Sequence, residues 1–432
     1  MLHQNYSYKI DPITNPIQGE VTISGAKNSV LPIICASLLN SHSTELSNVP
    51  HLNDVSILLE LLKSIDITTQ HSIEKEHVAI NGFVGDTKSV EIMSENTRKI
   101  RYSLLLMGAL LGKGIKNIKI NLPGGCTFSE RPYEMHIDGF EQMGCEITQY
   151  PEYIKITVPT KLKATTIRLR FPSVGATENL ILASCGVANG KTIIQNIAIE
   201  PEIIDLINYL KKLNINIDFI DQRTVKIDSS YKKSLVVAHK IIPDRIETIS
   251  WVILGALSSQ KGIVIKNIEI EHLLAPLLEL QKIGVFVTIS QNSIYAKQTN
   301  LQTFSSLISE VYPMLGTDYL PLFAVLLSTT TGESTIKDTI YPNRFEYLDE
   351  LSKMGLIYNQ KEGISTIKGT TLYTSSHVKA TDLRGGFATL LASILSKKET
   401  TIDNAYQIER GYANLIEKMQ NIGITIRKVD II

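Results

Sequence analysis

The sequence has no surplus of charge of either sign and no long apolar run. Its 432 residues include 43 Lys plus Arg and 43 Asp plus Glu. A balanced chain creates no global field that would draw it to nucleic acid or to an anionic membrane, so any anionic ligand must be held by a local cluster. The N-terminal stretch lacks a basic segment followed by an apolar one. We therefore expect a cytoplasmic protein with neither nucleic acid nor membrane as a partner.

Cysteine is also scarce, with four residues and no CxxC spacing. This usage suits a reducing compartment better than a secreted disulfide scaffold. Cys35, Cys145 and Cys185 lie in apolar segments and are predicted to be buried core thiols. No His, Cys and Asp residues show the spacing of metal ligands, so we expect no metal and no cofactor.

What the sequence does contain is an internal repeat. Each copy has an apolar helical run, a turn, a short alternating strand, a second helix and another strand. The period is about 70 residues, too long for a solenoid. The predicted end of the alternating strand recurs six times, at Asn48, Asn121, Asn196, Asn267, Asp338 and Asn404.

Six copies divide naturally into two threefold sets. The predicted fold is therefore α/β, with two lobes of three repeats each and a ligand cleft between them. The first lobe is expected over residues 26–240, and the second over 1–25 and 241–432. The N-terminal strand would complete the second lobe, and a monomer is the default expectation.

Charged residues recur where the repeats begin their helices. First helices begin near Lys27, Arg101, Arg245, Asp318 and Arg384, and second helices near Arg131, Arg344 and Arg410. Cations gain nothing from the helix dipole at an N-terminus. Exposed N–H groups and Arg side chains there favour phosphate or carboxylate. The alternative is that each Arg pairs with a nearby acid such as Asp244, Glu247 or Asp382. For any single Arg we favour a salt bridge with a nearby acid. For the whole set we favour an anion-binding site.

The segment NLPGGCTFSERPYEMH replaces the usual strand-to-helix turn by a longer loop. Its two glycines allow the backbone to open and close. Cys126 lies five residues before Arg131, and positive charge nearby favours the thiolate. The alternative is an exposed thiol without a role.

The motifs SGAKNSVLPI, LPGGC, FPSVGATEN, EPEIIDL, PDRIET, NRF, ATDLR and RGY occur in this order. Together they resemble the UDP-N-acetylglucosamine 1-carboxyvinyltransferase family over nearly the whole chain. The resemblance implies two inside-out α/β barrels. It also implies transfer of enolpyruvyl from phosphoenolpyruvate to the sugar 3-hydroxyl, with release of phosphate, as the first committed step of peptidoglycan synthesis.

The resemblance also assigns residues. Cys126 matches the general acid, which can form a covalent phospholactoyl adduct, and Asp318 matches the base that accepts the sugar hydroxyl proton. The residues implied to bind phosphoenolpyruvate are Lys27, Asn28, Arg101, Arg131, Arg344, Arg384 and Arg410. Those implied to bind the UDP-sugar are Arg101, Arg131, Pro132, Tyr133, Glu134, Met135, Ser173, Val174, Gly175, Asp318 and Ile340. For His136, a contact with substrate and a place in the core are comparable expectations.

The chain departs from the family pattern at Ser129, where Gly is usual, and at Glu134, where an Asp faces the uracil. The segment before Asp318 reads LGTD instead of FPTD, and Glu346 and Tyr347 follow NRF. These changes leave three alternatives open: a paralogue acting on another uridine nucleotide, an enolpyruvyl-shikimate-phosphate synthase, and a non-catalytic UDP-sugar-binding protein.

Overall fold

The protein is described by a computed structural model that covers residues 6–83, 87–123, 133–230, 233 and 235–430. The chain divides into two compact units. Unit 1 comprises Met1–Ser24 and Pro243–Ile432, and unit 2 comprises Gly25–Ile242. Unit 2 is thus an insertion in the sequence of unit 1, and the chain passes from one unit to the other twice.

Unit 2 contains three four-stranded sheets among its described residues. Their orders are β14-β3-β5-β4, β6-β7-β9-β8 and β10-β11-β13-β12. The strands are β3 (Thr44–Ser47), β4 (Thr69–Ser72), β5 (His77–Ile80), β6 (Ser89–Ile92), β7 (Asn117–Asn121), β8 (Glu146–Gln149), β9 (Tyr153–Thr157), β10 (Thr166–Arg168), β11 (Thr192–Gln195), β12 (Asn216–Asp221), β13 (Thr224–Asp228) and β14 (Val237–Lys240).

Unit 1, over the residues that are described, also has three such sheets. Their orders are β22-β23-β1-β24, β16-β17-β15-β2 and β18-β19-β21-β20. The strands are β1 (Tyr6–Ile10), β2 (Gly19–Thr22), β15 (Ile263–Lys266), β16 (Val287–Ser290), β17 (Ser293–Ala296), β18 (Ser306–Ser309), β19 (Glu333–Asp338), β20 (Ile357–Lys361), β21 (Ile364–Lys368), β22 (His377–Lys379), β23 (Thr400–Asp403) and β24 (Ile426–Asp430).

All six sheets share one topology. In five of the orders the first two strands run parallel and the remaining neighbours run antiparallel, and in β16-β17-β15-β2 the parallel pair is the last one, β15 with β2. Strand β1 completes the sheet of the last repeat by pairing with β23 and β24, and β2 pairs with β15. The predicted fold class, two α/β lobes of three repeats each, is confirmed.

Two sets of helices accompany the sheets. Those of unit 2 are α1 (Lys27–Ala36), α2 (Asn53–Lys63), α3 (Leu105–Lys113), α4 (Glu134–Gln142), α5 (Val174–Ser184) and α6 (Pro201–Lys212). Those of unit 1 are α7 (Arg245–Ser258), α8 (Leu274–Lys282), α9 (Leu320–Ser328), α10 (Glu346–Lys353), α11 (Leu383–Leu395), α12 (Tyr406–Glu409) and α13 (Leu415–Asn421). Short 3₁₀ helices cover Ser37–Leu39, Glu95–Lys99, Arg101–Leu104, Ile270–Leu273 and Thr317–Tyr319.

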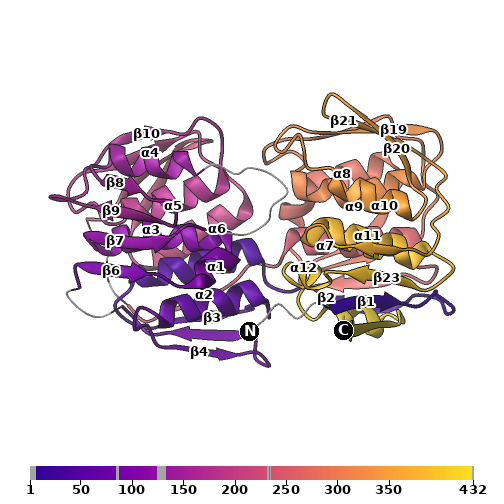
Figure 1. The fold of residues 1–432 in the computed structure, drawn as a ribbon, viewed down its shortest axis with the longest axis horizontal. Helices are drawn as coiled ribbons and strands as arrows, with labels where there is room; N and C mark the ends of the chain where they lie inside the picture. The colour runs from indigo at the N-terminus through magenta and orange to yellow at the C-terminus, as the bar shows by residue number, and fades with distance from the viewer. Residues whose placement is uncertain (1–5, 84–86, 124–132, 231–232, 234, 431–432) are drawn as a thin grey trace. The chain divides into compact units, whose positions relative to one another are not determined.

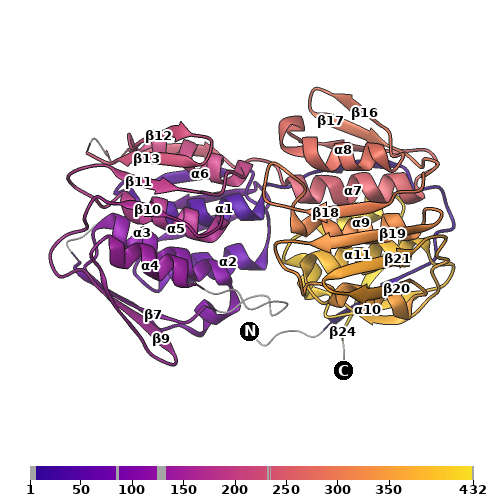
Figure 2. The ribbon, with the colours of Figure 1, turned by 90° about the horizontal axis from the view of Figure 1, so that it is seen from above.

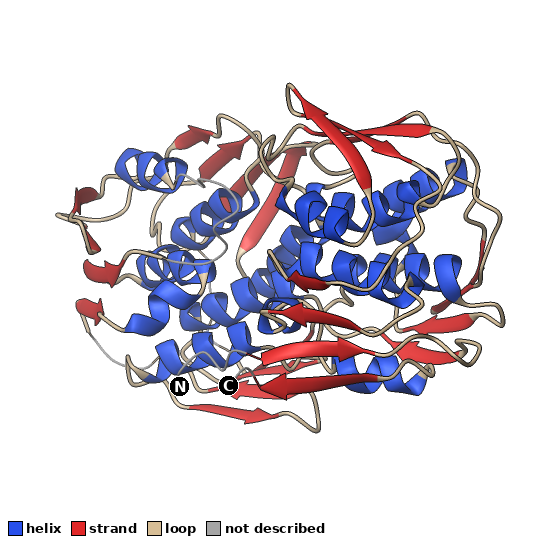
Figure 3. Cartoon of the chain, turned by 45° about the vertical axis from the view of Figure 1, so that its right-hand side comes forward, coloured by secondary structure: helices blue, strands red, loops and turns tan. Residues whose placement is uncertain are grey.

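The first helix of each repeat is buried on nearly all sides. In α9, the sequence LPLFAVLLS has every residue buried, and α3, α5, α7 and α11 are similarly apolar. A helix that is apolar all round belongs in a core. Figures 1 to 3 show the consequence within each unit, where strands lie outside and helices inside.

Glycine allows two of these core helices to approach closely. A Cβ added at Gly108 would lie 2.3 Å from the carbonyl oxygen of Asn179, and one at Gly112 would lie 2.1 Å from that of Leu182. The two glycines are four residues apart and lie on one face of α3, against α5. Larger residues there would force α3 and α5 apart.

In several repeats, an asparagine with a left-handed backbone conformation follows the alternating strand, as after β3, β11 and β15. Asn48, Asn196 and Asn267 have φ of 57°, 58° and 59°. Each donates its side-chain amide to the backbone of the neighbouring parallel strand, at 2.8 Å, 3.0 Å and 2.7 Å. Asparagine tolerates this backbone conformation. Its side-chain amide donates to a backbone carbonyl oxygen just beyond the hydrogen-bonded strand pair.

Asp338 does end its strand, as predicted, but it lies one residue before the position that asparagine occupies in other repeats. Asp338 pairs with Ser309 as the last residue of β19, just as Gln195 pairs with Arg168. The residue in register with Asn196 is therefore Thr339, whose hydroxyl donates to the carbonyl oxygen of Ser309. Thr339 and Asn196 thus both donate to a carbonyl oxygen at the end of the parallel strand, Thr339 to that of Ser309 and Asn196 to that of Leu169.

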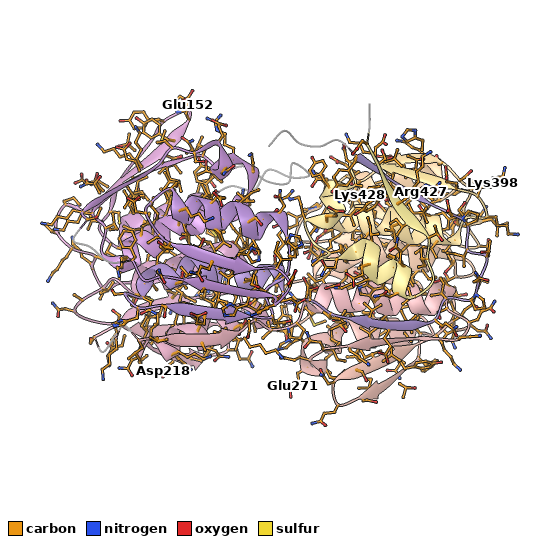
Figure 4. The ribbon with its side chains drawn as sticks, turned by 90° about the horizontal axis from the view of Figure 1, so that it is seen from below. Glu152, Asp218, Glu271, Lys398, Arg427 and Lys428 are labelled. Carbon is orange, nitrogen blue, oxygen red and sulfur yellow. The ribbon has the colours of Figure 1, made fainter. Side chains whose placement is uncertain are left out.

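Charged side chains collect on the outer strands. Figure 4 labels Asp218 in unit 2, and Arg427 and Lys428 on β24 of unit 1, all at the periphery of their units. Asp218 lies 3.5 Å from Lys226, and Arg427 lies 3.0 Å from Asp11. Within the described part of the chain, no helix has both the length and the apolar character needed to cross a membrane.

We expect Asn196→Ala to lower the free energy of unfolding by about 2 kcal/mol. About 1 kcal/mol comes from placing Ala in a left-handed conformation and about 1 from the lost hydrogen bond. Asn196→Gly loses only the hydrogen bond and should cost about half as much. Urea denaturation of both variants measures the difference. Equal costs would show that the backbone conformation contributes nothing.

Candidate active site

One of the deeply buried charged groups of unit 1 is the guanidinium of Arg344, which is 2% exposed. Its Nη1 lies 2.6 Å from Asp318 Oδ1, and its Nε lies 3.3 Å from Asp382 Oδ2. Burial alone would lower the pKa of Arg344, but Asp382 and Asp318 outweigh it and raise the pKa above its ordinary value. The guanidinium therefore stays charged and holds two carboxylates from different repeats together.

Two aspartates in this region also cap core helices. Asp244 accepts hydrogen bonds from the backbone N–H groups of Ile246 and Glu247 at the start of α7. Asp382 accepts from those of Arg384 and Gly385 at the start of α11. Each carboxylate satisfies N–H groups that the helix leaves unpaired and complements the helix dipole. The N-termini of α7 and α11 are thereby fixed beside the arginines.

Arg384 spans these two caps. It is 1% exposed, and its Nη2 lies 3.7 Å from Asp244 Oδ2. Its Nε and Nη1 are buried and have no hydrogen-bond partner among the described residues. Buried donors are nearly always paired, so these two require an explanation. An anionic ligand at the start of α11 would supply one.

Aromatic rings support Arg384 from one side. Its guanidinium lies 4.9 Å from the centroid of the Tyr412 ring, which stacks on Phe387 at 4.2 Å. Burial raises the pKa of Tyr412 to about 12, with Arg384 opposing the shift. Tyr412 is therefore neutral, and its hydroxyl shares a 2.8 Å hydrogen bond with Ser250.

Three other predicted residues of unit 1 lie in different settings. Arg245 begins α7 and donates to the hydroxyl of Tyr319 at 3.3 Å. The backbone N–H of Ile340 donates to Asp338 at 2.9 Å. Arg410 was expected at a helix start, but it lies at the C-terminal end of α12, where its Nη1 donates to Gln407. A cation at that end is favoured by the helix dipole.

In unit 2, Lys27 is the first residue of α1 and is almost fully buried. Its Nζ lies 2.7 Å from Asp54 Oδ2, on the first turn of α2. The neighbouring Asn28 accepts a 3.1 Å hydrogen bond from the hydroxyl of Tyr102, which follows Arg101. The starts of the first and second repeats of this unit therefore lie close together.

His136 is a core histidine in this structure. It is 4% exposed, and its Nδ1 lies 2.8 Å from Nδ2 of Asn179. Asn179 also donates to the carbonyl oxygen of Leu104 and accepts from the N–H of Gly108. Burial, with Arg101 nearby, lowers the pKa of His136 to about 3. The imidazole is therefore neutral, and it joins α4 to α5.

The residues expected to bind the UDP-sugar begin two helices. Tyr133 precedes α4, and Glu134 is its first residue. Ser173 caps α5, where its Oγ accepts from the N–H of Ala176. A Cβ added at Gly175 would lie 3.5 Å from the His136 ring, so the two helix starts are near each other. Cys126, Ser129, Arg131 and Pro132 lie outside the described residues.

The three predicted core thiols are confirmed. Cys35, Cys145 and Cys185 are free and buried. Burial raises the pKa of Cys145 to about 12, with Glu141 adding to the shift. A thiol with such a pKa is inert near neutral pH. Where the chain is described, no three His, Cys, Asp or Glu side chains are grouped so as to hold a metal ion.

Some of the arginines form salt bridges with nearby acids, which was the alternative to an anion-binding site. Arg344 pairs with Asp382 and Arg384 with Asp244, whereas Glu247 pairs with Lys418 at 2.6 Å. Sequence reasoning did not identify Asp54 or Tyr102 as partners of the site residues. Their signal was absent because the contacting residues are far apart in the sequence: Asp54 lies in the second helix of the repeat that Lys27 begins, and Tyr102 lies in the repeat after that of Asn28. Only the capping pattern of Asp before a helix start pointed to Asp244 and Asp382.

The fold matches those of solved enolpyruvyl transferases. The enolpyruvyl transferase NikO from Streptomyces tendae superimposes with a TM-score of 0.90 at 21% identity, covering 99% of this chain and 100% of the other. An EPSP synthase from Acinetobacter baumannii gives 0.76 at 15% identity, covering 98% and 100%. The family pattern described as EPSP synthase (3-phosphoshikimate 1-carboxyvinyltransferase) matches residues 12–419. The fold and the family pattern together define a carboxyvinyltransferase.

Sequence relatives are more specific. A UDP-N-acetylglucosamine 1-carboxyvinyltransferase 1 from Caldanaerobacter subterraneus subsp. tengcongensis is 36% identical over 95% of this chain and 97% of its own length. A UDP-N-acetylglucosamine 1-carboxyvinyltransferase 2 from Carboxydothermus hydrogenoformans is 36% identical over 96% and 97%. The chain belongs to the UDP-N-acetylglucosamine 1-carboxyvinyltransferase family, and the predicted family and enzyme class are confirmed.

The pKa of His136 predicts a loss of stability in acid. Its folded-state pKa is about 3, below the ordinary 6.5, so the unfolded chain binds the proton first as the pH falls. This contribution to stability is present above pH 6.5, and about 2 kcal/mol of it should be lost between pH 7.5 and pH 5. Urea denaturation at both pH values measures the loss. His136→Gln should lack this component, and an identical pH dependence in the variant would contradict the assignment.

Proposed function

We propose that the protein transfers the enolpyruvyl group of phosphoenolpyruvate to the 3-hydroxyl of UDP-N-acetylglucosamine and releases phosphate. This reaction commits the nucleotide sugar to peptidoglycan synthesis. The single observation that carries the proposal is the extent of the sequence similarity, since relatives with this enzyme's name match about 95% of the chain.

Asp318 is the proposed base. Its side chain is 30% exposed, while one oxygen is held by the buried Arg344. A carboxylate fixed on one side and open to solvent on the other can accept a proton from a substrate hydroxyl. Arg344 holds the carboxylate in a fixed orientation, which a base requires before the substrate arrives.

Cys126 is the proposed general acid. Its thiol proton would go to the methylene carbon of phosphoenolpyruvate while the sugar oxygen bonds to the adjacent carbon and loses its proton to Asp318. Phosphate then leaves and takes the hydroxyl proton from Asp318, and the methyl carbon returns its proton to the Cys126 thiolate as the double bond re-forms. The proton count balances, and neither a metal nor a redox cofactor is required by this sequence of steps.

The cationic residues would neutralise the two anionic groups of phosphoenolpyruvate. Arg384 offers two buried donors without a described partner, at the N-terminus of α11. Helix N–H groups and a guanidinium at one place suit a phosphate or a carboxylate. The other residues proposed to contact this substrate are Lys27, Asn28, Arg101, Arg131, Arg344 and Arg410.

The nucleotide sugar is proposed to contact the residues that the family resemblance assigns to it. The residues are Arg101, Arg131, Pro132, Tyr133, Glu134, Met135, Ser173, Val174, Gly175, Asp318 and Ile340. Free buried thiols suit a reducing compartment, so we place the enzyme in the cytoplasm. A monomer is proposed, since the first helices of all six repeats are already buried within their own units.

We expect phosphate release from phosphoenolpyruvate only when UDP-N-acetylglucosamine is present. Mass spectrometry of the nucleotide should show a gain of one enolpyruvyl group. Asp318→Asn should lower kcat by roughly 100-fold or more because the base is removed. Folded protein that releases no phosphate with this acceptor, but does so with another uridine nucleotide or with shikimate 3-phosphate, would overturn the proposed substrate.

Alkylation of Cys126 should block turnover, because the proposed acid would be consumed. The epoxide fosfomycin is a suitable reagent, and peptide mass spectrometry locates the adduct. Cys35, Cys145 and Cys185 provide internal controls, since buried thiols should remain unmodified. Cys126→Ser should lose activity and resist labelling. Full turnover by protein carrying the adduct would refute the role of Cys126.

A further inference from the structure

Asp338 accepts hydrogen bonds on both of its carboxylate oxygens. It is the last residue of β19 and is 2% exposed. Its Oδ1 accepts from the hydroxyl of Ser309 at 2.8 Å and from the backbone N–H groups of Ile340 and Tyr341 at 2.9 Å each. Its Oδ2 accepts from the hydroxyl of Thr317. Asp338 therefore joins β18 and the turn after β19 to the 3₁₀ helix Thr317–Tyr319.

The bond to Thr317 fixes the direction of that hydroxyl. Thr317 has one proton to donate, and it points to Asp338. The oxygen of Thr317 is then left as an acceptor, and Arg344 Nη1 donates to it at 3.3 Å. The same Nη1 donates to Asp318 at 2.6 Å. Asp338, Thr317, Arg344 and Asp318 thus form one directional chain of hydrogen bonds.

We propose that Asp338 is a positioning residue, which acts through Thr317 and Arg344 to hold the Asp318 carboxylate in place for proton abstraction. This inference rests on the proposed role of Asp318 as the base. Asp338 itself touches no reacting atom. Its carboxylate supplies the acceptor that sets the polarity of the whole chain.

The repeats show that the strand position alone does not demand this arrangement. Asp403 ends β23 and pairs with Lys379, as Asp338 pairs with Ser309. Its carboxylate is 32% exposed and takes hydrogen bonds from Ser7 and from His377. The same residue type at the same register position is therefore present at the surface in one repeat and buried beside the proposed base in another.

Asp338→Asn changes one oxygen to an N–H₂ group at nearly constant volume. If the amide replaces Oδ2, it donates to Thr317, whose own proton then has no acceptor on that side. If the amide replaces Oδ1, it meets three donors. Either arrangement leaves a buried donor unsatisfied, and rotation of Thr317 would withdraw its acceptor from Arg344. The Asp318 carboxylate should then lose its fixed orientation.

The test measures kcat and KM for the wild type, Asp338→Asn, Thr317→Val and Thr317→Ser in the phosphate-release assay. We expect kcat to fall by about 10- to 100-fold in Asp338→Asn and Thr317→Val, because small misplacements of a catalytic group cost this much. The KM for the nucleotide sugar should change by less than about threefold. Thr317→Ser keeps the hydroxyl and should retain near wild-type turnover.

The double variant Asp338→Asn with Thr317→Val should be no slower than the worse single variant, because both changes break one chain. Asp403→Asn is the matched control and should leave kcat unchanged. Wild-type kcat in Asp338→Asn, or equal loss in Thr317→Ser and Thr317→Val, would overturn the inference. Additive losses in the double variant would also overturn it.

A crystal structure of Asp338→Asn provides a test that does not depend on turnover. We expect a rotated Thr317 and a longer contact between Arg344 and Asp318. Unchanged positions of both side chains would exclude the positioning role. A wild-type enzyme that fails to release phosphate would instead refute the proposed function, so the two failures are distinguishable.

Discussion

The buried guanidinium of Arg344 sets the conditions for everything around it in unit 1. A cation removed from water must be met by carboxylates and hydrogen-bond acceptors, or its burial costs several kcal/mol. Asp382 meets this demand on one side while it caps α11, and Asp318 meets it on the other. Thr317 and Asp338 complete the arrangement. Removal of any one carboxylate would leave the charge unmatched, so the residues must be understood together.

The apolar core explains why polar groups gather at helix ends. The first helices of the repeats are buried along their whole length, and their side chains are mostly aliphatic. Their N-terminal ends present N–H groups together with the caps Asp244 and Asp382 and the side chain of Arg384. The N-termini of α7 and α11 are joined by the contact of Arg384 with Asp244, and the start of α9 is joined to α11 by Arg344. The positive end of the helix dipole at each of these N-termini adds to the attraction for anions.

Sequence patterns predicted the repeats, the fold class and the residue types of the site. The patterns are local, and alternation, helical spacing and capping residues are read from neighbours in the chain. The partners were harder to predict because they are distant in the sequence: Arg384 pairs with Asp244 of another repeat, and Lys27 pairs with Asp54 of the second helix in its own repeat. The end of β19 at Asp338 was predicted, but its register with the asparagines was not, because Thr339 occupies the position that asparagine has in other repeats. A repeat compared by letters alone cannot reveal that equivalence.

The pairing of β1 with β23 and β24 has a consequence for how the chain folds as it is synthesised. Residues 25–242 form a continuous stretch, so unit 2 can fold as soon as they leave the ribosome. Strand β1 is made first, yet its two neighbours are made more than 380 residues later. Until then its backbone N–H and C=O groups are an open template for pairing with other chains. The interval between the two ends of one sheet is therefore the period in which this protein depends most on chaperones.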